Sequence, residues 1–259
     1  HHRFLLPMSA LAADFWTTLP LATGVHLLAG DANGLAAFDK PFGVLSHPNS
    51  SQDEPRSLLT CRYDKETQCF SWKAADGSER QLWLLNRLDS ATSGVILTAA
   101  SEKLAIAIRE HYLKKQVTKI YQALVFGKPH KNSESWYDQV AVKNIRGQLR
   151  TSLIGNVPAE TLYRLIKHTQ RNFSTSLIRL EPLTGRSHQL RVQCAKRHSP
   201  IIGDQTYGDF ARNRSFAKAT KNKRLFLHSL ETSFTYEFAG RTCAFKATAP
   251  LPADFTTIY

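Results

Sequence analysis

The stretch 84–94 constrains the fold more than any other part of the chain, because it sets a charged pair between two apolar runs. The runs 82–85 and 95–97 predict buried strands, and the Ser/Thr/Gly cluster between them predicts a tight turn. The charged residues are Arg87 and Asp89. A carboxylate beside buried strands is costly unless a partner compensates its charge. Asp89 therefore either caps the turn through its own backbone, as Asp often does, or serves chemistry with a cationic partner.

The basic charge of the chain is high and unevenly distributed. The formal net charge is +13. Residues 186–224 hold ten Lys/Arg and two Asp/Glu, and residues 103–131 hold seven and one, so the remainder is near neutral. Concentrated basic charge favours a polyanion such as nucleic acid, and the alternative is a solvated surface that serves solubility. We expect phosphate contacts from Lys221, Lys223 and Arg224.

Cysteine spacing and hydropathy narrow the class of protein. No pair of the four cysteines has the spacing of a zinc knuckle or of a CxxC redox site, which predicts reduced thiols in a cytoplasmic protein. No apolar run is long enough to span a membrane. We expect neither a metal ion nor an organic cofactor. The pair His1-His2 is typical of a purification tag, and Met8 is a candidate native start.

Periodicity and turn residues predict the elements of the chain. Ser101 to Gln116 predicts an amphipathic helix with Ser101 as N-cap and Leu113 on its apolar face. The alternating run 117–127 predicts a strand. The other expected elements are a loosely structured arm (1–34), a strand and an extended piece (35–48), a short helix and a hairpin (49–80), two polar hairpin-like pieces (128–160), antiparallel strands (161–167 and 174–180) and a basic loop (211–224).

The segment around Asp89 resembles the catalytic motif of RluA-group pseudouridine synthases. That family has His-Arg-Leu-Asp, then a Thr-Ser-Gly turn and an apolar strand. Here Asn86 stands where the family usually has His, and Arg87 and Asp89 keep their places. The resemblance implies an RNA uridine isomerase with Asp89 as the catalytic carboxylate.

Further segments resemble motifs of the same family, in the same order along residues 35 to about 250. Gly-Arg-Ser-His-Gln-Leu-Arg (185–191) is similar to Gly-Arg-Thr-His-Gln-Ile-Arg, and 200–208 matches Pro-Ile-x-Gly-Asp-x-x-Tyr-Gly. Residues 119–127 resemble Lys-x-Tyr-x-Ala-x-Val-x-Gly, 35–48 resemble a strand leading into Asp-Lys-Pro-x-Gly, and 225–229 resemble Leu-x-Leu-His-Ala. Because several motifs in register make coincidence improbable, they favour the catalytic interpretation of Asp89. In the family, the cation of the Gly-Arg motif keeps the catalytic Asp ionised, and here that cation is Arg191.

The resemblance also implies residues that handle the RNA. Tyr121 packs against the flipped base, Arg87 fills the space that the base leaves, and Leu227 packs on the base. A core tyrosine is the alternative for Tyr121. The remaining substrate-binding residues are Lys40, Arg186, His188 and Gln189. For Lys40, and for nearby His47, a structural hairpin is as good an interpretation as phosphate contact.

The implied reaction breaks the N1–C1′ bond of uridine and joins C5 to C1′. It needs a carboxylate beside C1′ and C6 and no redox partner. Attack at C1′, attack at C6 and glycal formation are three open routes. The expected partner is structured RNA, ribosomal or transfer, and the protein is expected to be a monomer.

The fold that the resemblance implies is α+β: a mixed, mostly antiparallel sheet flanked by helices, with a central active-site cleft. We expect an N-terminal arm at 1–34 and one catalytic domain at 35–259. Two other functions fit the sequence less well. An RNA-binding protein that has lost catalysis would fit Asn86 but not the intact Arg87, Asp89, Tyr121 and Arg191. A sugar hydrolase would need a second acidic residue in a comparable motif.

Overall fold

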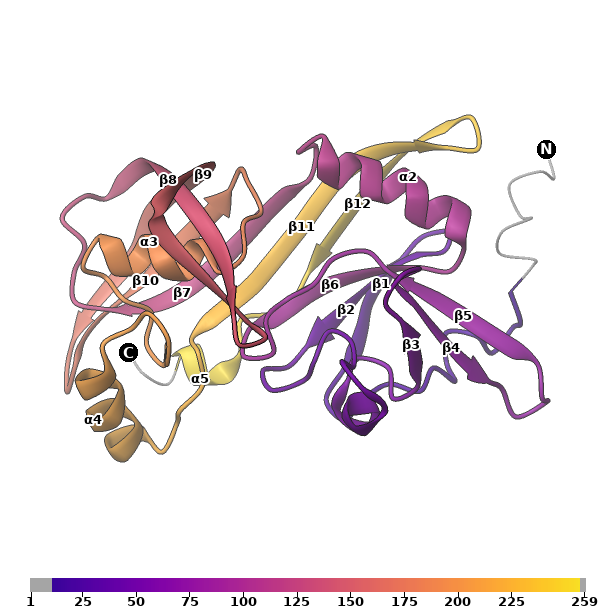
Figure 1. Ribbon diagram of the computed structural model, residues 1–259, viewed down its shortest axis with the longest axis horizontal. Coiled ribbons are helices and arrows are strands. Elements are labelled where there is room, and N and C mark those ends of the chain that lie inside the picture. The colour runs from indigo at the N-terminus through magenta and orange to yellow at the C-terminus, as the bar shows by residue number, and fades with distance from the viewer. Residues whose placement is uncertain (1–10, 257–259) are drawn as a thin grey trace. The chain divides into compact units, whose positions relative to one another are not determined.

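The computed structural model describes residues 11–256 (Figure 1). The expected features at His1-His2 and Met8 lie outside the described residues. The chain forms two compact units. Unit 1 holds the described residues up to 117 together with 231–249, and unit 2 holds 118–230 together with the described residues from 250.

Unit 1 is built on strands, most of which pair antiparallel with their neighbours. Their order is β3-β4-β5-β6-β11, with β2 paired to both β6 and β1, and β12 paired to β11. The strand β11 begins in unit 2 and enters unit 1 at Glu231. The elements are β1 (His26–Gly30), β2 (Leu35–Lys40), the 3-10 helix η1 (Ser51–Arg56), β3 (Arg62–Asp64), β4 (Cys69–Lys73), β5 (Glu79–Leu84), β6 (Ser93–Ala99), α2 (Glu102–Leu113), β11 (Leu227–Phe238) and β12 (Arg241–Thr248).

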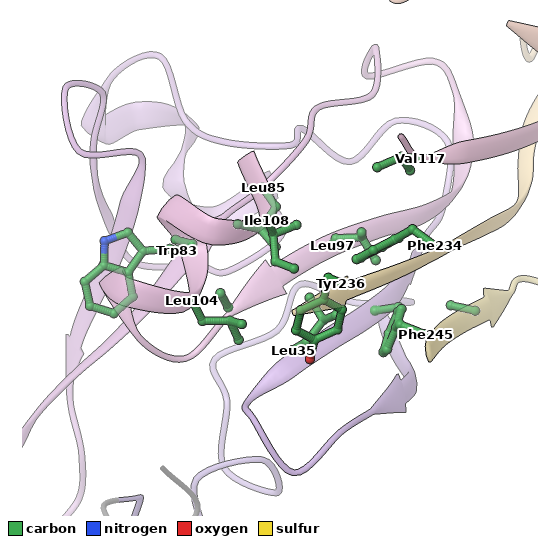
Figure 2. Close-up of a cluster of buried hydrophobic side chains, with 14 of the residues drawn as sticks. Leu35, Trp83, Leu85, Leu97, Leu104, Ile108, Val117, Phe234, Tyr236 and Phe245 are labelled. Atoms are coloured by element: carbon green, nitrogen blue, oxygen red, sulfur yellow. The ribbon is translucent and has the colours of Figure 1, made fainter. Parts of the chain in front are cut away.

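The core of unit 1 forms around β6, whose seven residues are all buried. Figure 2 shows one cluster, in which Leu97 of β6, Ile108 of α2 and Phe234 of β11 come together. The helix α2 begins as expected, since the Ser101 side chain accepts a hydrogen bond from the Leu104 N–H (3.2 Å). The buried strands expected before and after the Asp89 turn are confirmed as β5 and β6.

Two details of unit 1 differ from the expectation. Leu113 is 81% exposed, because Tyr112, four residues after Ile108, occupies the next position on the buried face. The arm at 1–34 is also more regular than expected, since β1 pairs with β2. Its register shifts between Leu27 and Ala29, so a bulge interrupts the two-residue period that identifies strands.

Unit 2 contains four antiparallel strands in the order β7-β10-β9-β8, in which β8, β9 and β10 are successive neighbours and β7 pairs with β10. Residues 128–160 were expected to form two hairpin-like pieces. They belong instead to one long hairpin of β8 and β9, which turns at Arg146 (φ 52°) and Gly147 (φ 81°), the backbone that a type I′ turn requires. The elements are β7 (Thr118–Phe126), β8 (Ser133–Ile145), β9 (Gln148–Gln170), β10 (Ser174–Pro182), α3 (Gln189–Lys196), α4 (Phe210–Thr220) and α5 (Ala253–Thr256).

The prediction of a basic loop at 211–224 is wrong, because most of this segment forms the helix α4. The Asp209 carboxylate caps the helix by accepting from the Arg212 N–H (3.0 Å). Phe216 packs into the core of unit 2 with Phe126 and Phe226. A single large apolar side chain among basic residues gives too little periodicity for a sequence-based assignment.

The fold class predicted from the sequence, α+β with a mostly antiparallel sheet and helices, is confirmed. Among the described helices, none combines the length and the hydropathy needed to cross a membrane. The expected boundary at residue 34 and the expected central cleft remain predictions.

Candidate active site

The segment 86–92 continues the pairing of β5 with β6 in unit 1. The Leu85 N–H donates to the Leu97 carbonyl (2.9 Å), and the Asn86 side-chain oxygen accepts from the Leu97 N–H (2.7 Å). The turn then closes when the Thr92 N–H donates to the Asp89 carbonyl (2.9 Å). Asn86 therefore has a structural role in extending the ladder, and the half-buried Asp89 stands at the start of a fixed turn.

Lys40 holds this turn from the end of β2. Its side chain is fully buried, and Nζ donates to the carbonyls of Pro41 (3.1 Å), Val44 (2.6 Å) and Ser90 (3.2 Å). A buried ammonium is stable only when such acceptors replace water. This geometry favours the structural interpretation of Lys40 over contact with RNA phosphate.

Ser46 is a second anchor that the sequence analysis missed. Its buried hydroxyl donates to the Leu88 carbonyl (2.7 Å) and accepts from the Leu88 N–H (2.9 Å). The Gly43 N–H adds a bond to the Ser90 carbonyl (2.6 Å). Because these contacts join residues more than forty positions apart, no local pattern in the sequence reveals them.

Arg87 is exposed and lies in the electrostatic neighbourhood of His47. The His47 ring stacks on Tyr63, with ring centroids 4.6 Å apart. Burial lowers the pKa of His47, and the positive charge of Arg87 lowers it further. An exposed guanidinium beside an aromatic ring stack is a combination that suits an unstacked nucleotide.

The motif 185–191 lies in unit 2 and begins α3. His188, in the left-handed conformation (φ 53°), is the residue that precedes the helix, so Ser187, a residue type that often caps helices, stands one position too early to be the N-cap. The Arg186 Nε donates to the Pro158 carbonyl (2.8 Å). Gln189 is buried and its side chain bonds to Glu160, Thr184, Arg186 and Thr161, which favours a structural role over RNA contact.

The same polar network continues along α3 to β8. The Gln193 side chain accepts from the Thr161 hydroxyl (2.6 Å) and donates to the Asp138 carboxylate (3.0 Å). Asp138 is buried and also pairs with Lys196 and with Arg197 (2.8 Å). Burial acts to raise the pKa of Asp138, but hydrogen bonds from these cations and from Gln193 hold it below its usual range.

Arg191 forms a two-pronged ion pair with Asp204, which the sequence analysis did not include. Nε donates to one carboxylate oxygen (3.0 Å) and Nη2 to the other (2.8 Å), and both side chains are largely buried (11% and 1% exposed). Burial opposes ionisation of Asp204, but the bond and charge of Arg191 together with the Thr206 and Tyr207 N–H groups hold its pKa below the usual range. Asp204 thereby fixes the guanidinium in one orientation.

Tyr207 completes the surroundings of Arg191. The guanidinium lies over the Tyr207 ring, 5.2 Å from its centroid. The Tyr207 hydroxyl bonds to His188 Nδ1 (2.7 Å) and accepts from the Thr151 N–H (2.9 Å). One tyrosine thus connects the predicted residues His188 and Arg191 with the β8–β9 hairpin.

The other predicted residues of unit 2 are positioned by strands. Tyr121 is half-buried in β7, opposite Leu180 of β10, and Leu227 is buried at the start of β11. In the same strand as Tyr121, burial lowers the pKa of Lys119, whose Nζ approaches the turn at Gly185. Lys119 is therefore a cation beside the 185–191 motif that the sequence analysis did not single out.

The structure groups the predicted site residues within each unit. In unit 1, Arg87 and Asp89 lie in the turn between β5 and β6, and Lys40 at the end of β2 bonds to that turn. Arg186, His188, Gln189 and Arg191 belong to one segment of unit 2, and Tyr121 and Leu227 lie in the same unit. The pairing of Asp89 with Arg191 would join the two units and remains a prediction.

Several cations that the charge count included are held by carboxylates within the protein. Besides Arg191, Lys196 and Arg197, Arg224 is buried (side chain 1% exposed) and lies 3.7 Å from Asp254. The expectation that Arg224 contacts phosphate is therefore wrong, because burial removes it from the surface. Between residues 11 and 256, no group of three His, Cys, Asp or Glu side chains is placed to hold a metal ion, and the four cysteines are free thiols.

Comparison with known proteins identifies the family. The RNA pseudouridylate synthase model matches residues 34–196. A tRNA pseudouridine synthase C from Vibrio vulnificus is 31% identical over 221 residues, which cover 82% of this chain and 85% of that protein. The dual-specificity RNA pseudouridine synthase RluA of Escherichia coli is 30% identical over 219 residues, which cover 84% and 88%. Human RNA pseudouridylate synthase domain containing 1 shares the fold, with a TM-score of 0.65, 19% identity, and coverage of 89% of this chain and 86% of that one.

These matches define an enzyme class, the isomerases that form pseudouridine in RNA. The chain belongs to the RNA pseudouridylate synthase family, in its RluA group, as its motifs predicted.

Proposed function

We propose that this enzyme converts specific uridines of structured transfer or ribosomal RNA into pseudouridine, with Asp89 as the catalytic carboxylate acting on a flipped-out base. The observation that carries the proposal is the anchoring of the Asp89 turn. Lys40, Gly43 and Ser46 bond to the backbone on both sides of Asp89, at Leu88 and Ser90. A carboxylate on a turn fixed in this way suits a reaction that demands close positioning.

The proposed reaction is balanced without a cofactor. The N1–C1′ bond breaks, the uracil turns, and a C5–C1′ bond forms. C5 releases its hydrogen as a proton, and N1 gains a proton. The carboxylate acts beside C1′ and C6, and it must be ionised to do so.

Arg191 is the proposed cation that keeps Asp89 ionised. This guanidinium is a planar fork of N–H donors, a geometry that suits carboxylates, and Asp204 already engages it through Nε and Nη2. A guanidinium pre-oriented by Asp204 and Tyr207 would lose little freedom on pairing with Asp89. In the same proposal, Tyr121 packs against the base and Arg87 occupies the space that it leaves.

The decisive experiment is Asp89→Asn, with release of the uridine C5 hydrogen from labelled RNA as the measurement. The amide is nearly isosteric but is not an anionic nucleophile, so we expect release at background and RNA binding near that of the wild type. Asp76→Asn is the control, because the Asp76 carboxylate accepts a local N–H bond in a turn, from Ser78 (2.9 Å), which is the capping role that the structural alternative assigns to Asp89. If Asp89 only caps its turn, Asn should substitute well, and persistent release would refute the proposal.

A catalytically inactive RNA-binding protein is the second candidate, because Asn86 replaces the family His. The bond from the Leu97 N–H to Asn86 weakens this candidate, since it gives Asn86 a structural role next to an intact Asp89. Absence of hydrogen release from every RNA bound by the wild type would favour it.

We also propose that the enzyme acts as a cytoplasmic monomer without a metal ion or organic cofactor. Full activity after dialysis against a chelator, and a monomeric mass by light scattering, are the expected results.

A further inference from the structure

Unit 2 contains an open pocket of about 490 Å³ on a part of the sheet that the proposed chemistry does not use. It lies where the start of β8 and the last part of β9 meet the segment after β7. Its lining residues include three cations and a histidine, and none of these described lining residues is acidic. The full lining is Lys128, Asn132, Ser133, Arg164, Leu165, Ile166, Lys167 and His168.

A β-bulge brings two of the cations to the same face of the sheet. Arg164 pairs with Arg179 of β10, whereas Lys167 pairs with Leu177, so Ile166 is the extra residue in β9. Arg179 and Leu177 are two positions apart and share a face, and residues opposite each other across a ladder also share a face. Arg164 and Lys167 therefore point to the same face of the sheet. In a regular strand, two residues that are three positions apart would point to opposite faces.

The rest of the pocket wall is also fixed by hydrogen bonds. The Leu165 N–H donates to the Asn132 carbonyl (2.7 Å), which ties the segment before β8 to β9. The Gly127 N–H donates to the Ser174 carbonyl (2.8 Å), and the Ser176 hydroxyl donates to the Gly127 carbonyl (2.7 Å). These bonds hold the backbone just before Lys128. The charged groups thus project from a pre-formed scaffold rather than from a loose loop.

The pocket faces away from the candidate catalytic residues of unit 2. Tyr121 pairs with Leu180, and Leu180 lies next to Arg179 in β10, so Tyr121 and Arg164 are on opposite faces. A nucleotide whose base packs against Tyr121 does not occupy this pocket. An RNA that engages it must extend past the target nucleotide.

We propose that this pocket binds a backbone phosphate of the RNA substrate at a point remote from the target uridine. The proposal rests on the proposed function. It adds a site through which the enzyme would distinguish a large RNA from the isolated stem-loop that contains the target uridine. Three cations without a carboxylate in the lining suit a phosphate. The described lining residues include no Phe, Tyr or Trp, and therefore none of the large aromatic side chains on which bases usually stack.

The test compares the double variant Arg164→Gln/Lys167→Gln with the wild type. Both residues are exposed, so the fold should survive the change. The matched control is Arg62→Gln/Lys73→Gln, which removes the same two charges from exposed positions of β3 and β4 in unit 1. The probes are an unmodified tRNA transcript and its isolated target stem-loop, each labelled with tritium at uridine C5.

We expect the pocket variant to bind the transcript roughly tenfold more weakly and to show a shallower salt dependence, by about one to two units of slope. Binding and hydrogen release with the stem-loop should match the wild type, and the control should change neither. Unchanged affinity for the transcript, or an equal loss with the stem-loop, would overturn the pocket proposal. If instead the wild type releases no hydrogen while the pocket variant still loses affinity for the transcript, the proposed catalysis fails and the phosphate site stands.

Discussion

The two motifs of the candidate active site are held in place in different ways. In unit 1, the turn that carries Asp89 is fixed through its main chain, by the Lys40 ammonium, the Ser46 hydroxyl and the Gly43 N–H. In unit 2, the helix that carries Arg191 is fixed through side chains, above all by the carboxylates of Asp204 and Asp138.

This difference shows how each type of functional group is positioned. A short side chain such as Asp follows its backbone closely, so fixing the neighbouring peptide groups fixes the carboxylate. A long side chain such as Arg retains several rotatable bonds even on a rigid helix. It therefore needs partners at its tip, and Asp204 and Tyr207 supply them.

The largest effect is expected from Arg191→Met. If side-chain anchoring matters most for α3, this change should lower turnover by about 10²–10³-fold and cost roughly 3 kcal/mol of unfolding free energy, because Asp204 is left as a buried, uncompensated charge. The measurements are hydrogen release and urea denaturation. Arg179→Met is the control, since Arg179 is more exposed and its distance to Glu181 is 3.7 Å. Turnover within a few-fold of the wild type would exclude Arg191 as the partner of Asp89 and make Arg186 the candidate.

Lys40→Met tests the main-chain anchoring of the Asp89 turn. Three carbonyls would lose their hydrogen bond from the ammonium, so we expect a loss of roughly 2 kcal/mol in unfolding free energy and a fall in turnover. The affinity for RNA should stay unchanged, because the Lys40 ammonium is buried. Lys73→Met, at an exposed position of β4, is the control for the loss of one charge. A specific loss of RNA affinity with stability intact would instead support the interpretation of Lys40 as a phosphate ligand.

Ser46→Ala should have a smaller effect of the same kind. Removing the hydroxyl breaks both bonds to Leu88, which should cost about 1–2 kcal/mol and lower kcat several-fold with little change in KM. Ser78→Ala in the exposed turn between β4 and β5 is the matched control. A change in KM alone would show that Ser46 affects RNA binding rather than the placement of Asp89.

Lowering the pH should have the smallest effect under ordinary conditions. It should also distinguish the two motifs, because only one of them should lose stabilisation in acid. The pKa values of Asp204 and Asp138 are held low in the folded state, so their stabilisation is complete above the unfolded value of about 4. It is lost as pH falls through the lower folded values. The bonds of Lys40 and Ser46 to the Asp89 turn are made with main-chain groups, which do not titrate. Hydrogen exchange measured below about pH 4 should therefore rise in α3 before it rises in 86–92, and the reverse order would contradict the comparison.

The sequence predicts those parts of the molecule whose signals are local. The strands around Asp89 and the capped start of α2 follow from short-range periodicity and from Ser101. The helix α4 was missed, because basic residues surround its one large buried side chain, Phe216. The resemblance to the family predicted Arg191 as a site residue, but the bond to Asp204 depends on the turn that folds back after α3. Local patterns cannot predict such a contact.

Shared strands also determine when each unit can be completed during protein synthesis. A ribosome finishes the first 117 residues of unit 1 long before it reaches Glu231, yet the core of that unit needs Phe234, Tyr236 and Phe245 from the far end of the chain. Unit 2 in turn needs Phe255 in its core, so neither unit is complete until the far end of the chain has been made. Until then, the apolar side chains of β6 lack part of their cover, which makes the nascent chain a candidate client for chaperones.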